Sequence, residues 1–149
     1  MPISLQCSTL PLTAKEVEQL WQAVITQRGF RDEVVAIRCI SEAEIQQLNA
    51  TYRGKNQPTN VLTFSYGQND TWPGHDSDAH HDVPLCLAVA KREAAARGLK
   101  LKDYAALLLV HAFLHITGMD HERSDQEALS TAEAERAILT TCGFSAVAW

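Results

Sequence analysis

Apolar residues recur along this chain with two periods, one typical of helices and the other typical of strands. Steps of three and four residues predict helices, and five segments have this pattern: 13–29, 41–52, 91–98, 104–117 and 124–142. Alternating or β-branched apolar runs predict four strands, at 3–7, 34–40, 60–64 and 83–89. This order of elements predicts an α/β (α+β) fold with one layered domain over residues 1–149, in which a small mixed four-stranded sheet packs against about five helices.

Three of the predicted helices begin at a capping box, in which a Ser or Thr precedes a Glu by three residues. The matching segments are Thr13–Glu16, Ser41–Glu44 and Ser124–Glu127. In the helix that follows Ser41, the residues Ile45, Leu48 and Tyr52 recur at helical spacing. We therefore expect these three side chains to form the buried face of that helix.

The most apolar helical segment contains two histidines. Residues 104–117 are almost entirely apolar apart from His111 and His115, so this helix is expected to be buried on most sides and to end at Gly118. His111 and His115 are four residues apart, which places both imidazoles on one face, about one turn apart. His121 follows six residues after His115, close enough to return to the same point.

Three converging imidazoles are typical of a catalytic zinc site. Three neutral nitrogens leave one position of a tetrahedral zinc open, and such a zinc lowers the pKa of its bound water to about 7. The alternative is that these are ordinary core or helix-end histidines, but two polar side chains buried in an apolar helix are costly unless they are satisfied. We therefore predict one Zn²⁺ on His111, His115 and His121, although imidazole also suits nickel, copper and iron.

Two neighbouring positions refine this prediction. Zinc proteases of the H-E-x-x-H type have a Glu directly after the first His as general base, whereas position 112 is Ala here. This removes the usual mechanism of peptide-bond cleavage but not the metal. Asp120 precedes His121 and either orients a ligand imidazole or caps a turn, and the sequence favours neither.

The segment 67–82 is rich in Gly, Asp and His and has little aliphatic character, which predicts a surface loop. It contains a rival cluster of metal-binding residue types, namely His75, Asp76, Asp78, His80, His81 and Asp82. A flexible loop makes a poorly preorganised site, so we interpret these histidines as solvated loop residues.

Composition and charge narrow the function further. The 149 residues are 46% apolar and 21% charged, as expected for a globular protein. No run approaches the roughly 18 apolar residues of a membrane span, and the N-terminus lacks the pattern of a secretory signal, so we expect a cytoplasmic protein. The net charge of −5 argues against coating of nucleic acid by bulk electrostatics but not against a local basic groove.

Cysteine usage points away from a thiolate site. Cys7, Cys39, Cys86 and Cys142 are spread along the chain without a C-x-x-C pair. This pattern predicts reduced thiols rather than a disulfide framework or a thiolate zinc site.

Residues 111–121, with the sequence HAFLHITGMDH, resemble the H-G-x-L-H-x-x-G-y-D-H signature of the YbeY family of bacterial endoribonucleases. A second family block is matched by Leu48–Arg53 and Pro58–Phe64, and the resemblance extends over residues 41–144. It implies a zincin-like metal helix, with zinc held by the three histidines. It also implies a single-strand-specific endoribonuclease of 16S rRNA 3′-end maturation and late ribosome quality control. Single-stranded RNA and the ribosome or its subunit proteins are the expected partners; DNA and membranes are not.

The resemblance adds two candidate catalytic residues. Arg53 corresponds to the functional arginine of the family, and a guanidinium is able to bind phosphate bidentately. Without the resemblance, a basic residue at a helix C-terminus is explained by the helix dipole. The acidic position of the family falls on Asp82, where His80 and His81 replace the usual Leu-Gly. The other departure is Ala112, where the family usually has Gly.

Two other functions are compatible with the same residues. A zinc hydrolase of another bond class would have a carboxylate base near the metal. A non-catalytic module that binds RNA or the ribosome would have a closed structural zinc, with Asp82 or a loop histidine as fourth ligand.

Basic residues are candidates for an RNA path, namely Lys55, Lys91, Arg92, Arg97, Lys100 and Lys102.

Overall fold

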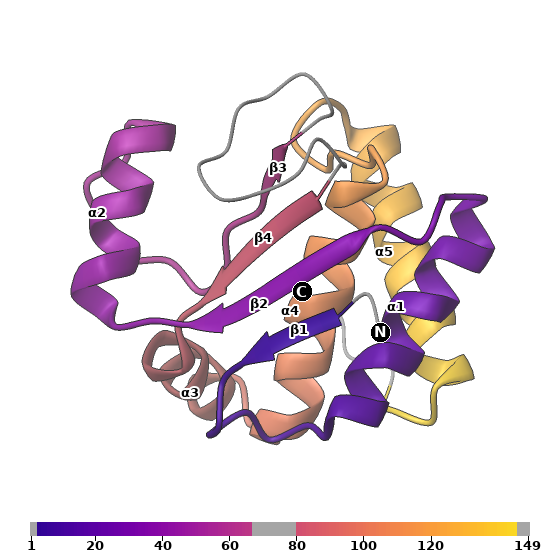
Figure 1. Ribbon diagram of the computed structural model, residues 1–149, viewed down its shortest axis with the longest axis horizontal. Coiled ribbons are helices and arrows are strands. Elements are labelled where there is room, and N and C mark those ends of the chain that lie inside the picture. The colour runs from indigo at the N-terminus through magenta and orange to yellow at the C-terminus, as the bar shows by residue number, and fades with distance from the viewer. Residues whose placement is uncertain (1–2, 67–79, 146–149) are drawn as a thin grey trace.

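Three parallel strands and one antiparallel edge strand form a mixed sheet. The computed structural model describes residues 3–66 and 80–145. Its strands are β1 (Ile3–Gln6), β2 (Val34–Cys39), β3 (Phe64–Tyr66) and β4 (His80–Leu85), in the order β1-β2-β4-β3 (Figure 1). β2 pairs in parallel with both β1 and β4, whereas β3 pairs antiparallel with β4. The prediction of a mixed four-stranded sheet is confirmed, and the structure adds the strand order.

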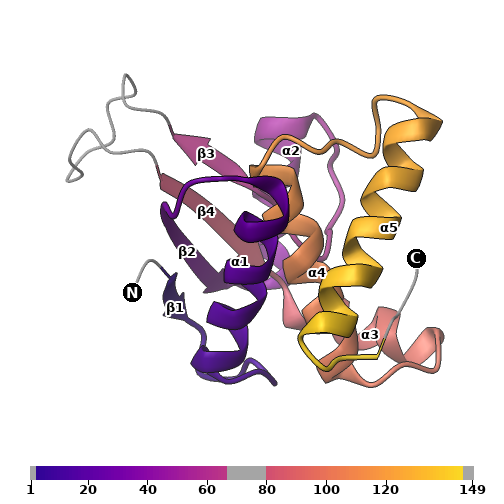
Figure 2. The same ribbon diagram turned by 90° about the vertical axis from the view of Figure 1, so that its right-hand side faces the viewer.

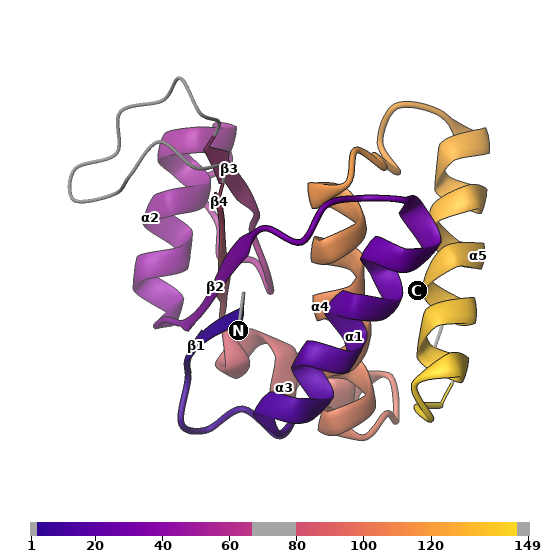
Figure 3. The same ribbon diagram turned by 45° about the vertical axis from the view of Figure 1, so that its right-hand side comes forward.

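Helices cover both faces of this sheet. They are α1 (Ala14–Arg28), α2 (Glu42–Arg53), α3 (Leu87–Ala96), α4 (Leu101–Ile116) and α5 (Asp125–Thr141). Figure 3 shows α2 on one side of the sheet and α1, α4 and α5 on the other. Figure 2 shows α4 between the sheet and α5, so that α4 is surrounded by other elements. No helix in the described ranges is long and apolar enough to cross a membrane.

The interior position of α4 explains its apolar sequence. Nearly every side chain from Tyr104 to Ile116 is buried, and the exceptions include His111 and His115. Phe113 of α4 packs edge-on against Trp21 of α1, with the ring centroids 5.2 Å apart, and both side chains are fully buried. Burial of an aromatic side chain of this kind stabilises a fold by about 3 kcal/mol, so α4 is firmly held and provides a rigid base for its histidines.

Two capping boxes are complete, and the third is used differently. Thr13 and Ser41 form the reciprocal bonds at α1 and α2. At α5 the amide of Glu127 donates to the Ser124 hydroxyl at 3.0 Å, but the Glu127 carboxylate accepts from Arg123 at 2.9 Å and from the amide of Asp120 at 3.3 Å. The Glu127 side chain therefore holds the turn between α4 and α5.

Several predicted boundaries are wrong, because pairing in the sheet outweighs local composition. The edge strand β3 begins at Phe64, while the preceding segment follows β4 irregularly, with the amide of Leu62 donating to the carbonyl of Pro84 at 3.0 Å. The strand predicted for 83–89 ends at Leu85, because α3 begins at Leu87. The loop predicted for 67–82 is wrong for residues 80–82, which belong to β4, and 67–79 lie outside the described residues.

The prediction that all four cysteines are reduced thiols is also wrong. Cys7 and Cys39 form a disulfide, with their Cα atoms 5.1 Å apart, whereas Cys86 and Cys142 are free. The reason is the register of the parallel pair, in which Gln6 lies opposite Arg38. The next residue of each chain segment is a cysteine, and a separation of this size suits a disulfide.

Candidate metal centre

The C-terminal end of α4 and the turn after it present the three histidines. His111 and His115 lie one turn apart on α4, and the helix ends at Ile116. Gly118 follows with φ of 101°, a backbone conformation that residues with side chains rarely adopt, and it lets the chain reverse toward His121. The imidazole rings of His111 and His121 meet edge-on, with their centroids 4.6 Å apart. The structure thus brings His111 and His121 into contact, with His115 one helical turn from His111.

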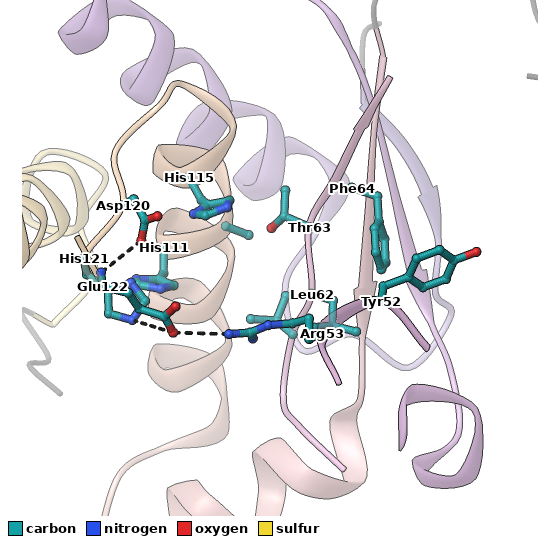
Figure 4. A pocket seen from close by; sticks show the side chains of 12 residues that line it. Tyr52, Arg53, Leu62, Thr63, Phe64, His111, His115, Asp120, His121 and Glu122 are labelled. Carbon is teal, nitrogen blue, oxygen red and sulfur yellow. Dashed lines mark hydrogen bonds and ion pairs between the residues drawn. The ribbon is translucent and has the colours of Figure 1, made fainter. Parts of the chain in front are cut away.

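One cleft is lined by these imidazoles on one side and by residues of α2 and the segment leading into β3 on the other (Figure 4). It has a volume of about 420 Å³ and lies between α4, the segment before β3 and the end of α2. All three histidines line it, together with Arg53 and Asp120. A second lobe of about 500 Å³ adjoins the first, since both lobes share Arg53, His111 and His121.

The donor set of the cleft fits a zinc ion. Among the described residues, no three His, Cys, Asp or Glu side chains already have the geometry of an assembled metal site. The three imidazoles nevertheless line one cavity, and His115 and His121 are exposed to solvent within it. Partial burial lowers the pKa of His115, and the neighbouring His111 and His121 act in the same direction. A lowered pKa keeps the imidazole neutral at pH 7, the form that binds metal.

Asp120 caps the turn after α4, and its charge also acts on His115. Its Oδ1 accepts a hydrogen bond from the amide of Glu122 at 2.9 Å. This bond holds the pKa of Asp120 below its ordinary value, and the nearby histidines contribute less. Of the two interpretations that the sequence left open, the structure favours the turn.

Arg53 reaches the same cleft from the end of α2. Its guanidinium donates to Glu122 Oε1 at 3.2 Å, and Figure 4 shows it extended toward the histidine side of the cleft. The Arg53 side chain is 38% exposed, so a ligand in the cleft has access to it. Arg53 also lies in the last turn of α2, as the dipole interpretation requires. The helix dipole does not explain why Arg53 lines the same cleft as the three histidines.

Glu135 of α5 contacts His111, and the sequence did not predict this contact. This α5 residue is 2% exposed, and its Oε2 lies 2.5 Å from Nδ1 of His111. The two residues are 24 positions apart in different helices. The only signal in the sequence is an acidic residue on the buried face of an amphipathic helix, beside Ala134 and Ile138.

Asp82 is not brought to this cleft. It lies opposite Phe64 in the β3–β4 register, and Arg38 binds its carboxylate through two hydrogen bonds of 3.0 and 2.9 Å. Asp82 is absent from the described residues that line either lobe of the cleft. The Asp82 carboxylate instead forms an ion pair with Arg38 on the sheet. The resemblance of the sequence to the family did not predict this pair.

The histidines predicted to be loop residues have other environments. His81 is 5% exposed in β4, where its Nδ1 contacts the Ser65 hydroxyl and its Nε2 contacts Glu33, each at 2.8 Å. The prediction of a solvated histidine is therefore wrong for His81. His80 stacks against Tyr66, with ring centroids 5.0 Å apart. His75, Asp76 and Asp78 lie outside the described residues.

The basic residues suggested for an RNA path do not border the cleft. Arg92 forms an ion pair with Glu42 at 2.7 Å, and Lys102 forms one with Glu16 at 3.0 Å. In the described part of the chain, the residues that line the two lobes include Arg53 but none of the six suggested basic residues. Most of these charges lie around α3 and the start of α4, away from the histidine end of that helix.

The fold and the cleft define a class of protein: an α/β domain with a solvent-accessible cluster of imidazoles and a guanidinium, a donor set suited to metal-dependent hydrolysis. The family model described as Endoribonuclease YbeY matches residues 3–143. The chain belongs to this family, as the resemblance of its motifs predicted.

Individual relatives agree with this assignment. An Endoribonuclease YbeY from Aromatoleum aromaticum is 41% identical over 123 residues, which cover 82% of this chain and 73% of that protein. One from Colwellia psychrerythraea is 35% identical over 147 residues, or 96% and 92% of the two chains. The solution structure of TM1509 from Thermotoga maritima has a TM-score of 0.58 at 21% identity, covering 93% of this chain and 90% of that one, and shows the same fold.

Proposed function

We propose that this chain is a zinc-dependent endoribonuclease that cleaves single-stranded RNA in 16S rRNA 3′-end maturation and late ribosome quality control. The observation that carries the proposal is one cleft, lined by three imidazoles and a guanidinium, in a member of an endoribonuclease family. The proposed partners are the 16S rRNA and the ribosome or its subunit proteins. The proposed location is the cytoplasm, where a ribosomal substrate would be met.

His111, His115 and His121 would hold the zinc. When bound, zinc supplies a Lewis acid for the attacked phosphodiester and lowers the pKa of water. The open side of the cleft supports a catalytic rather than a structural site. Asp82, one of the candidates for a fourth ligand, is bound to Arg38 instead.

Arg53 would bind the non-bridging oxygens of the scissile phosphate. Charge accumulates on these oxygens in the transition state, and a guanidinium within hydrogen-bond reach stabilises it. In the free protein Arg53 binds the Glu122 carboxylate, an anion that a phosphate would displace. The ion pair is exposed and therefore weak, so its exchange for a phosphate costs little.

Glu135 would fix the orientation of His111. Its carboxylate accepts the Nδ1 proton of the imidazole, which leaves Nε2 with a lone pair for the metal. We therefore expect Glu135→Gln to weaken zinc binding by about 10- to 100-fold, the usual effect of losing such a partner. Competition with a chromophoric chelator measures this affinity. Glu133→Gln makes the same change at an exposed position of α5 and should bind zinc as the wild type does; equal affinities in both variants would exclude the proposed role of Glu135.

The substrate class is tested by comparing the cleavage of phosphodiester bonds in RNA with the cleavage of peptide bonds. The same preparation is incubated with single-stranded RNA, with the same RNA in a duplex and with a peptide library. We expect cleavage of the single strand, much slower cleavage of the duplex and none of the peptides. Cleavage of peptides without cleavage of RNA would instead support a zinc hydrolase of another bond class, for which Asp120 and Glu122 of the first lobe are candidate carboxylate bases.

A further inference from the structure

An exposed aromatic ring lies at the rim of the cleft. Within the described residues, the large apolar side chains that are exposed are Val34, Tyr52 and Leu129, and Tyr52 is the aromatic one among them, at 66%. The sequence predicted Tyr52 on the buried face of α2, together with Ile45 and Leu48. Ile45 is fully buried and Leu48 packs against the same cluster, so only the last residue of the predicted stripe departs from it.

The Tyr52 ring is held in place by a second aromatic side chain. It meets Phe64 of β3 in an edge-on contact, with the centroids 5.1 Å apart and the planes at 66°. Phe64 packs in turn against the cluster formed around Ile45. The ring of Tyr52 is thereby positioned without being covered, which lowers the entropy lost when a ligand packs against it.

The aromatic pair belongs to the same cleft as the proposed metal site. Tyr52 and Phe64 line the lobe that His115 and Arg53 also line. Figure 4 shows the histidines at one side of this lobe and the two aromatic rings at the other, with Thr63 between them. Apart from the imidazoles of His111 and His121, the described residues that line the adjoining lobe are not aromatic, so the Phe and Tyr rings are confined to the first lobe.

We propose that Tyr52, supported by Phe64, is a stacking site for one unpaired nucleobase next to the scissile phosphate. The site rests on the proposed function, since it requires RNA to cross the cleft. Tyr52 directly precedes Arg53, so one turn of α2 would supply a contact to a base and a contact to a phosphate. A base in a duplex is already paired and stacked, whereas a base in a single strand is free to turn onto an aromatic ring. The site would therefore contribute to selectivity for single strands.

The site is tested by RNA binding in the absence of metal, where cleavage does not interfere. Fluorescence anisotropy follows a labelled single-stranded RNA bound to the protein in a chelator. Tyr52→Leu keeps apolar bulk but removes the ring, and we expect it to weaken binding by about 5- to 150-fold, the effect of losing one stacked base. Tyr52→Phe keeps the ring and should bind as the wild type does. Leu129→Ala, at an exposed apolar residue outside the cleft, is the control and should leave the affinity unchanged.

The salt dependence of binding separates stacking from charge. Tyr52→Leu should leave the slope of log Kd against log salt unchanged, whereas Arg53→Gln should reduce it by about 0.7, the contribution of one phosphate contact on a single strand. Wild-type affinity in Tyr52→Leu would overturn the proposal, and so would an equal loss in Tyr52→Phe. Because no metal takes part, loss of affinity in Tyr52→Leu would support the base site even if zinc-dependent cleavage failed.

Discussion

Replacing His115 by alanine should remove bound zinc and RNA cleavage together. His115 lies one turn from His111 on α4, and it is exposed in the cleft, so the substitution removes a ligand without opening a cavity in the core. A site reduced to two imidazoles no longer has the three protein ligands that catalytic zinc sites use. We expect zinc content to fall to background and cleavage to fall with it. Elemental analysis and an RNA cleavage assay on the same preparation measure both.

The matched control is another histidine of the chain. His80 lies in β4 and is not among the described residues that line the cleft. His80→Ala should therefore retain the zinc content and the cleavage rate of the wild type. Cleavage at the wild-type rate by a metal-free His115→Ala protein would show that the histidines are not the catalytic centre.

Replacing Arg53 by glutamine should slow cleavage without changing zinc content. Loss of one preorganised donor to transition-state charge typically lowers kcat about 10²- to 10³-fold. Arg53→Lys keeps the charge but not the planar pair of donors, so only part of the activity should return. Single-turnover kinetics on a single-stranded RNA give the rates, and metal analysis shows whether the site is still loaded.

Arg92 provides the control for this second prediction. It also forms an ion pair with a glutamate, Glu42, but outside the cleft. Arg92→Gln should cleave RNA at the wild-type rate. If Arg53 served only the dipole of α2 or its pair with Glu122, Arg53→Gln would be as harmless as Arg92→Gln, and that result would remove it from the proposed mechanism.

Local patterns predicted the histidine-bearing helix α4 well, because the signals for a helix and for its buried face are short-range. Four-residue spacing places His111 and His115 on one face whatever the rest of the fold is. The apolar run around them predicts burial, and Gly118 predicts the reversal that returns His121 to the cluster. Each of these inferences needs only a few neighbouring residues, which is why they agree with the structure.

Contacts between distant segments were not predictable in the same way. Glu135 meets His111 only because α5 packs on α4, and Cys7 meets Cys39 only because β1 and β2 are in parallel register. A motif also does not determine which partner a carboxylate finds, and Asp82, which was expected at the candidate site, pairs with Arg38 of the neighbouring strand β2. Tyr52 differs from its predicted burial because the sheet edge, unlike the middle of a sheet, leaves the end of α2 open.

Zinc titration of the metal-free protein tests most directly that this cleft is a zinc-dependent ribonuclease centre. Cleavage of a single-stranded RNA is measured after each addition of Zn²⁺. We expect no cleavage at the start, a rise in proportion to the zinc added and a plateau at about one equivalent per chain, because three imidazoles hold a single ion. Cleavage at the full rate before any zinc is added, or none after saturation, would contradict this function.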